Sequence, residues 1–179
     1  YGCNARLLAA HQHNEEGAAQ QVIGRLALGE SVALVVDAGT PAVSDPGARL
    51  VARVRAAGYR VIPLPGPCAA IAALSAAGLS EAHFLFYGFL PAKAGQRAEA
   101  LSELTHLPYA LIFYEAPHRI VDTVAALAVA FQPTRTLVLA RELTKLFESV
   151  HACALGAAND WPLADANRQR GEFVLLLSG

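Results

Sequence analysis

The sequence predicts an α/β protein in which a parallel α/β domain, residues 1–90, is followed by a mixed α+β domain, residues 91–179. Val32–Val36 indicates the first domain, because a continuous apolar run without polar alternation is typical of a strand covered on both faces of a parallel sheet. Thr136–Arg141 and Leu146–His151 indicate the second, since the few residues between them allow only antiparallel pairing. With 54% hydrophobic and 16% charged residues, the 179-residue chain can bury a sizeable core.

Capping and turn residues place the elements of the first domain. Asn14 precedes two acidic residues, which suit the positive end of a helix dipole, so we expect a helix to begin there. Asp45-Pro46 is expected to be the N-cap and first turn of the next helix, and Pro65-Gly66-Pro67 ends a second strand. The expected helices begin at Asn14 and cover Pro46–Ala57 and Cys68–Ala77, and the expected strands cover Val32–Val36, Tyr59–Leu64 and His83–Tyr87.

The second domain is expected to begin after Leu90, within a stretch from Gly88 to Gly95 that breaks all periodicity. Its first strand ends in a charged turn, Glu115–Arg119, which leads into a helix with an apolar stripe. The expected helices cover Arg97–His106 and the residues from Ile120, and the expected strands cover Tyr109–Tyr114, Thr136–Arg141, Leu146–His151 and Glu172–Ser178.

The loop that follows Val32–Val36, Asp37-Ala38-Gly39-Thr40-Pro41, is the first candidate for a ligand site. Ligands of open α/β sheets bind outside the carboxyl ends of the strands, and Gly39 permits a positive φ or a close backbone approach. The loop lacks the G-x-G-x-x-G and G-x-x-x-x-G-K-[ST] patterns, which disfavours an NAD or ATP enzyme. A tight connection without a ligand is the alternative.

Charge and cysteine content limit the class of protein. The net charge of −1 argues against a protein that coats nucleic acid generally, although a local basic patch is compatible with it. Cys3, Cys68 and Cys153 are odd in number and far apart, which implies neither a disulfide framework nor a zinc site and favours a reducing cytoplasm. His11 and His13 have no partners at metal-ligand spacing, so no metal is expected. The chain contains no methionine, even at its start, and is expected to be an internal portion of a longer protein.

Six segments, in this order, carry a family resemblance: VALVVDAGTPAVSDPG, VIPLPGPCAAIAALSAAGL, GFLPAK, LIFYEAPHRI, LARELTK and GEFVLLLSG. Together they resemble the tetrapyrrole-methylase-like superfamily of S-adenosylmethionine (SAM) methyltransferases. Within it they are most similar to the bacterial ribosomal RNA small subunit methyltransferase I family, which methylates a cytidine ribose 2′-hydroxyl of 16S ribosomal RNA. The opening strand of that family and its proline-rich loop have no counterpart here, so we expect the first domain to lack its first strand.

The resemblance implies a two-domain tetrapyrrole-methylase-like fold that holds SAM in a cleft between its domains. It implies cofactor contacts at two loops of the first domain and two turns of the second: Asp37, Ala38, Gly39, Thr40, Val43, Cys68, Ala69, Glu115 and Leu143. It also implies small-subunit ribosomal RNA as the partner, in the assembled subunit, together with a homodimer and a cytoplasmic location.

Methyl transfer from SAM depends mainly on aligning the acceptor oxygen with the methyl group. A ribose hydroxyl is a very weak acid, so we expect a general base, or a cation that stabilises the developing alkoxide, to help. By position in the family motifs, Glu115, His118, Glu142 and Lys145 are the catalytic candidates, and Arg119 and Lys145 are the substrate-binding candidates. A structural ion pair or helix cap is the alternative for each. Two other functions stay open, a methyltransferase acting on a corrin or porphyrin carbon and a non-catalytic RNA-binding module.

Overall fold

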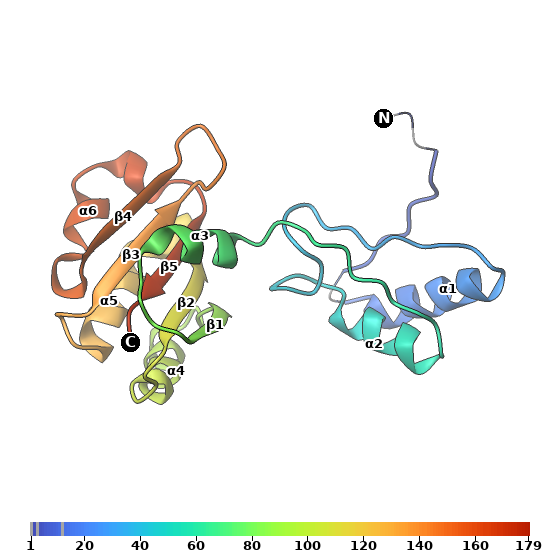
Figure 1. Ribbon diagram of the computed structural model, residues 1–179, viewed down its shortest axis with the longest axis horizontal. Helices are drawn as coiled ribbons and strands as arrows, with labels where there is room; N and C mark the ends of the chain where they lie inside the picture. The colour runs from blue at the N-terminus through green and yellow to red at the C-terminus, as the bar shows by residue number, and fades with distance from the viewer. Residues whose placement is uncertain (1, 3, 12) are drawn as a thin grey trace. The chain divides into compact units, whose positions relative to one another are not determined.

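A computed structural model describes residues 2, 4–11 and 13–179, so Cys3 lies outside the described residues. The chain forms two compact units that divide after Cys68 (Figure 1). The domain boundary predicted after Leu90 falls inside the second of these units. The division into two domains at that point stays a prediction. None of the helices in the described part of the chain has the length and apolar run that a membrane span requires.

The first unit contains a pair of packed helices, α1 (Glu15–Ala27) and α2 (Ala48–Ala56). The residues buried between them are apolar, namely Ala18, Ala19 and Val22 of α1 and Leu50 and Val54 of α2. Glu15 is also buried, and its Oε2 accepts hydrogen bonds from the backbone N–H groups of Arg49 at 3.0 Å and Leu50 at 3.3 Å. The first N–H groups of a helix have no intrahelical partner. Glu15 accepts hydrogen bonds from two such groups of α2 and thereby links α1 to α2.

Two predicted helix caps of the first unit differ in the structure. Asn14 occupies the N-cap position of α1, but its side chain makes no capping hydrogen bond, and its Oδ1 instead accepts from the His11 N–H at 2.7 Å. Gly47, not Asp45, is the N-cap residue of α2, with a φ of 128°. The prediction of an Asp45 cap is therefore wrong, because Glu15, which is distant in sequence, caps this helix instead.

The structure also corrects two predicted strands. The described part of the first unit contains helices and no strand, so Val32–Val36 and Tyr59–Leu64 pair with nothing in a sheet. Their side chains lie largely in solvent, with Val35 76% and Leu64 81% exposed. A valine-rich run favours a strand only where a neighbouring strand supplies hydrogen bonds to its backbone, and neither segment has such a neighbour among the described residues.

The second unit is built on a mixed sheet of five strands in the order β1-β2-β5-β3-β4. Strands β1 and β2 are parallel, and the other neighbours, β2–β5, β5–β3 and β3–β4, are antiparallel. The α/β class and the antiparallel β3–β4 pair are thus confirmed. The strands are β1 (Phe84–Phe89), β2 (Ala110–Glu115), β3 (Thr136–Arg141), β4 (Ser149–Ala154) and β5 (Phe173–Leu177). Only β4 begins clearly later than predicted.

One face of this sheet carries the main core. Leu111 and Phe113 of β2 and Leu175 of β5 pack there against α4 (Ala94–Leu104) and α5 (Ile120–Ala130). The 3₁₀ turn η1 (Pro117–Arg119) leads directly into α5. Short helical turns complete this unit between β4 and β5, namely η2 (Leu155–Ala157), α6 (Asp160–Leu163) and η3 (Ala166–Gln169).

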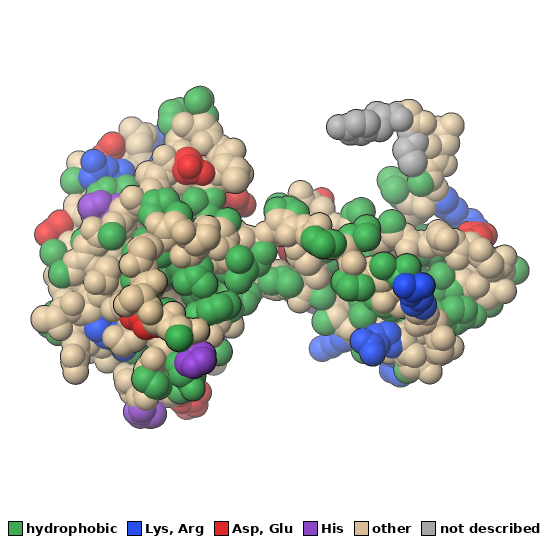
Figure 2. Space-filling model, in the orientation of Figure 1, with side chains coloured by type: hydrophobic (Ala, Val, Ile, Leu, Met, Phe, Trp, Pro, Cys, Tyr) green, Lys and Arg blue, Asp and Glu red, His purple; other side chains and the backbone are tan. Residues whose placement is uncertain are grey.

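The opposite face of the sheet is crossed by α3 (Ala69–Ala77), which contacts β2, β3, β4 and β5 (Figure 1). Ala70 and Ala73 are the buried residues of this helix, and their small side chains let its backbone approach the sheet closely. Figure 2 shows hydrophobic side chains gathered on this side of the unit. The edge strands are less covered than the centre, because Phe89 of β1 is 52% and Val150 of β4 is 41% exposed.

Candidate functional site

The first unit brings the 37–41 loop, which is predicted to bind the cofactor, against the turn that directly precedes Cys68, another predicted contact. The hydroxyl of Thr40 donates a hydrogen bond of 2.9 Å to the carbonyl oxygen of Pro67, which joins the 37–41 loop to the 65–67 turn. The fit at this junction is close, since a Cβ on Gly66 would lie 3.2 Å from Thr40 Oγ1. Gly39 has a φ of +80°, a conformation that favours glycine. Asp37, Ala38 and Gly39 are exposed, so their backbone groups are accessible to a ligand.

Val43 lies in a strained stretch directly after the 37–41 loop. Its two neighbours, Ala42 and Ser44, have φ values of 67° and 57°. Such values are uncommon for residues other than glycine, and they persist where the surrounding structure enforces them, most often at functional sites. Val43 itself donates from its N–H to the carbonyl of Thr40 at 3.3 Å. This stretch is therefore held in a defined, strained shape around a predicted cofactor contact.

In the second unit, Glu115 at the end of β2 is buried, and its side chain is 0% exposed. Its Oε1 accepts a hydrogen bond of 2.7 Å from the N–H of Ala116, and its Oε2 accepts one of 2.5 Å from the hydroxyl of Thr123. The Nε of Arg119 lies 3.2 Å from Oε1, at ion-pair distance. These contacts support the structural alternative for Glu115, whose predicted roles in catalysis and cofactor binding stay predictions.

Arg119 also holds a distant piece of backbone. Its guanidinium donates hydrogen bonds to the carbonyl oxygens of Leu90 at 2.7 Å and Pro91 at 3.3 Å. Arg119 thereby fixes the segment after β1 against the start of α5. Its side chain is 18% exposed. The adjacent His118 is exposed on η1. The predicted substrate contact of Arg119 and the catalytic role of His118 stay predictions.

Tyr114 makes a contact that the sequence argument missed. Its hydroxyl accepts a hydrogen bond of 3.1 Å from the N–H of Ala70, in the first turn of α3. The phenol ring is packed edge to face against Phe86 and Phe89, with centroid distances of 4.9 Å and 5.7 Å. Tyr114 therefore positions the helix that begins at Ala69, a predicted cofactor contact. Its place directly before Glu115 in a family motif was the available signal.

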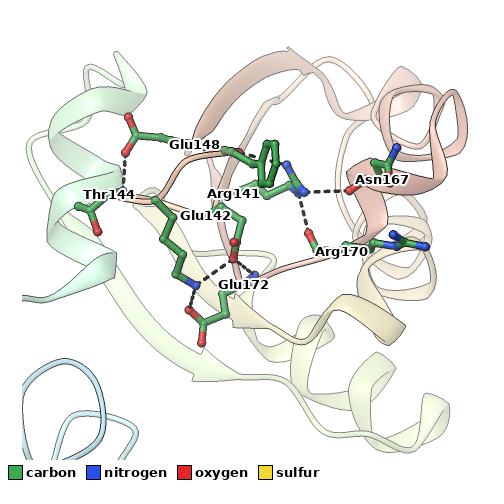
Figure 3. A network of polar contacts seen from close by, with 9 residues as sticks. Arg141, Glu142, Thr144, Glu148, Asn167, Arg170 and Glu172 are labelled. Atoms are coloured by element: carbon green, nitrogen blue, oxygen red, sulfur yellow. Dashed lines mark hydrogen bonds and ion pairs between the residues drawn. The ribbon is translucent and has the colours of Figure 1, made fainter.

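The loop between β3 and β4, residues 142–148, contains a charged network (Figure 3). The ammonium of Lys145 donates hydrogen bonds to Glu142 Oε1 at 2.9 Å and to Glu172 Oε2 at 2.7 Å. The N–H of Glu172 donates to the same Glu142 oxygen at 2.9 Å. Hydrogen bonds from Lys145 and from this backbone N–H lower the pKa of Glu142, and hydrogen bonds to Glu172 and Glu142 raise the pKa of Lys145.

These shifts limit the chemistry that the network can perform. A carboxylate with a lowered pKa is a poor proton acceptor, and an ammonium with a raised pKa keeps its charge at neutral pH. Glu142 therefore stays ionised and Lys145 stays cationic. Lys145 is suited to stabilising developing negative charge rather than to removing a proton.

Leu143 lies in a setting like that of Val43. It is half-buried between Glu142, with a φ of 52°, and Thr144, with a φ of 65°. Among the described residues, the non-glycine residues with positive φ are Ala42 and Ser44, which flank Val43, and Glu142 and Thr144, which flank Leu143. Each of the two units thus has one strained loop, and in each the strain flanks a residue predicted to contact the cofactor.

Comparison with known sequences relates the chain to one family. A model of the family Tetrapyrrole (Corrin/Porphyrin) Methylases matches residues 4–159. Over all 179 residues the chain is 49% identical to the Ribosomal RNA small subunit methyltransferase I of Escherichia coli O157:H7 and 50% identical to that of Pseudomonas aeruginosa. It is 51% identical to the protein of the same name from Xylella fastidiosa strain Temecula1. The chain spans 63%, 64% and 66% of the lengths of these relatives, which is less than two thirds of each.

Solved structures share the fold. The crystal structure of the methyltransferase CobJ matches 92% of this chain and 71% of its own, with a TM-score of 0.67 and 23% identity. The cobalt precorrin-4 methyltransferase CbiF matches 96% of this chain and 73% of its own, with a TM-score of 0.66 and 16% identity. Uroporphyrin-III C-methyltransferase from Thermus thermophilus, complexed with S-adenyl homocysteine, matches 92% of this chain and 73% of its own, with a TM-score of 0.61 and 15% identity. With the family model matching most of its residues, the chain belongs to the tetrapyrrole (corrin/porphyrin) methylases.

Proposed function

We propose that the protein is a SAM-dependent methyltransferase that methylates the ribose 2′-hydroxyl of a cytidine in 16S ribosomal RNA. The observation that carries the proposal is the identity of 49–51%, over the whole chain, to three proteins named Ribosomal RNA small subunit methyltransferase I. Because the chain spans less than two thirds of those relatives, the proposal concerns the full-length protein. The solved corrin and porphyrin enzymes, at 15–23% identity, support the fold and say nothing of the substrate.

The residues predicted to hold SAM fit such a ligand. The exposed backbone at Ala38 and Gly39 offers hydrogen-bonding groups, and the Thr40–Pro67 hydrogen bond keeps this loop against the 65–67 turn. We propose that these groups, with Val43 and the Cys68-Ala69 start of α3, contact the cofactor in the first half of the chain. Leu143 is proposed to do so in the second. When bound, SAM supplies a methyl group on a sulfonium, which is an intrinsically good leaving group.

The second unit supplies the charged groups for catalysis. We assign Lys145 to stabilising the developing alkoxide of the ribose, because its raised pKa keeps it protonated while Glu142 and Glu172 hold its ammonium in place. Glu142 and Glu115 are unsuited to removing the proton, since one has a lowered pKa and the other is buried and hydrogen-bonded. His118, exposed on η1, is the remaining candidate among the predicted groups for the general base.

The proposed partner is ribosomal RNA in the assembled small subunit, and the proposed form is a cytoplasmic homodimer. The net charge of −1 supports recognition of a folded RNA shape rather than of arbitrary RNA, because unselective binding depends on many lysines and arginines that release counterions.

Methyl mapping of ribosomal RNA tests the proposal. Deletion of the gene should remove 2′-O-methylation from one cytidine of 16S ribosomal RNA, and the wild-type gene should restore it. The Lys145→Ala gene should restore it poorly, although the variant binds SAM. An unchanged methylation pattern in the deletion strain would refute the proposed substrate. RNA binding without methylation would favour the non-catalytic module instead.

A further inference from the structure

The loop of residues 142–148 presents two large apolar side chains to solvent. Leu146 is 90% exposed and Phe147 is 66% exposed. Exposed apolar side chains that occur singly are common on protein surfaces. This pair is unusual because several hydrogen bonds hold the backbone that carries it.

Arg141, the last residue of β3, makes the first group of these hydrogen bonds. Its guanidinium donates hydrogen bonds to the backbone carbonyl oxygens of Arg170 at 2.6 Å and Asn167 at 2.9 Å (Figure 3). A third hydrogen bond, of 3.1 Å, runs to the carbonyl oxygen of Phe147. The backbone at Phe147 is therefore fixed to the segment that leads into β5.

The remaining hydrogen bonds lie within the loop. The N–H of Thr144 donates to Glu148 Oε2 at 2.5 Å, and the N–H of Glu148 donates to the carbonyl of Lys145 at 3.1 Å. The N–H of Lys145 donates in turn to the carbonyl of Glu142 at 3.0 Å. A loop that is already ordered loses little conformational entropy on binding. Its exposed tip is therefore suited to binding a ligand.

We propose that the Phe147 ring stacks on an unpaired nucleobase of the RNA substrate, an inference that rests on the proposed function. Proteins recognise unpaired bases by stacking them on exposed aromatic rings beside cationic side chains. Lys145 is two residues from Phe147, and the exposed Arg170 is tied to the same loop through Arg141. Leu146 adds apolar contact next to the ring.

The small extent of this apolar surface favours a base over a protein partner. Stable protein interfaces bury about 800 Å² on each partner, whereas the large apolar side chains that this loop exposes are Leu146 and Phe147. A single base needs only one accessible aromatic face, which the side chain of Phe147 offers.

Three substitutions of Phe147 in the full-length protein test the stacking. The binding probe is the small ribosomal subunit purified from the deletion strain. Phe147→Ala should raise its Kd roughly 5- to 150-fold, the range for loss of one base–aromatic stack. Phe147→Leu, which keeps apolar bulk without a ring, should be nearly as weak. Phe147→Trp should bind like the wild type, and SAM affinity should be unchanged in all three.

Leu163→Ala is the matched control, because Leu163 is 60% exposed in the same unit and lies on α6, away from the loop. It should bind the subunit like the wild type. Wild-type affinity in Phe147→Leu would indicate simple apolar contact and overturn the stacking, as would wild-type affinity in Phe147→Ala. A wild-type protein that neither binds nor methylates the subunit would overturn the proposed function and the stacking together.

Discussion

Gly171 faces Glu142 so closely that a Cβ added to Gly171 would lie 2.5 Å from the Glu142 carboxyl carbon. Gly171 also has a φ of +90°, which side chains disfavour. The next residue, Glu172, donates its N–H to Glu142 and accepts a hydrogen bond from Lys145. The absence of a side chain at position 171 therefore leaves the space in which Glu142 positions Lys145.

We predict that Gly171→Ala displaces the Glu142 carboxylate and lowers the rate of methyl transfer. The backbone strain alone should cost roughly 1–2 kcal/mol. Gly78→Ala is the control, because Gly78 has a φ of +67° and no atom within 4 Å of an added Cβ. Denaturant unfolding should show this strain in both variants, with an added loss in Gly171→Ala from the displaced Glu142, whereas kcat should fall only in Gly171→Ala. Equal kcat values would show that the position of Glu142 does not matter for catalysis.

The second prediction concerns the 37–41 loop. Gly39→Val should weaken SAM binding at least roughly ten-fold, because valine disfavours the φ of +80° and we propose that the loop contacts the cofactor through its backbone. Gly29→Val is matched to it, with a φ of +79° just after α1 and no atom within 4 Å of an added Cβ. Calorimetry on the full-length protein should find SAM affinity reduced only in Gly39→Val. An unchanged SAM affinity in Gly39→Val would show that the loop is not part of the cofactor site.

Glu115 is predicted to contribute to stability through its buried partners. Removing one member of a buried ion pair costs roughly 3–5 kcal/mol, and Glu115→Gln should fall at the lower end because Arg119 is partly exposed. Thr123→Val, which removes one hydrogen bond to the carboxylate, should cost roughly 1–3 kcal/mol. Asp122→Asn makes the same chemical change at an exposed neighbour and should cost less than about 0.5 kcal/mol. Denaturant unfolding measures all three. A stable but inactive Glu115→Gln variant would instead indicate a catalytic role.

The pH dependence follows from the shifted groups of the loop. The pKa of Glu142 is below its ordinary value of 4.5. Its contribution to folding stability is therefore present above that pH and is lost as the pH falls through the lowered pKa. The pKa of Lys145 is above its ordinary value of 10.5. Its contribution to folding stability is therefore present below that pH and is lost as the pH rises through the raised pKa. The loss of kcat in Lys145→Ala should therefore be the same factor from about pH 6 to about pH 9. A factor that changes across this range would show that Lys145 titrates there.

The helices of both units and the strands of the second unit could largely be predicted from sequence, but the strand predictions in the first unit failed. Thr136–Arg141 and Val32–Val36 are both apolar runs, yet only the former is a strand, β3, with β5 on one side and β4 on the other. Side chains determine which residues favour an extended backbone. The hydrogen bonds that make a strand come from its neighbours, which a run of sequence does not reveal.

For the candidate site, the sequence by itself determined which loops carry glycine, proline and charged residues, because these types act through local φ and local charge. Only the tertiary structure decided what each group contacts. It places Thr40 against Pro67, Glu115 against Thr123 and Glu142 against Gly171 and Glu172. It also shows that Glu115 is enclosed while Lys145 stays accessible. The physical reason is that burial and hydrogen bonding depend on which distant segments meet, and those contacts shift a pKa or hold a strained φ.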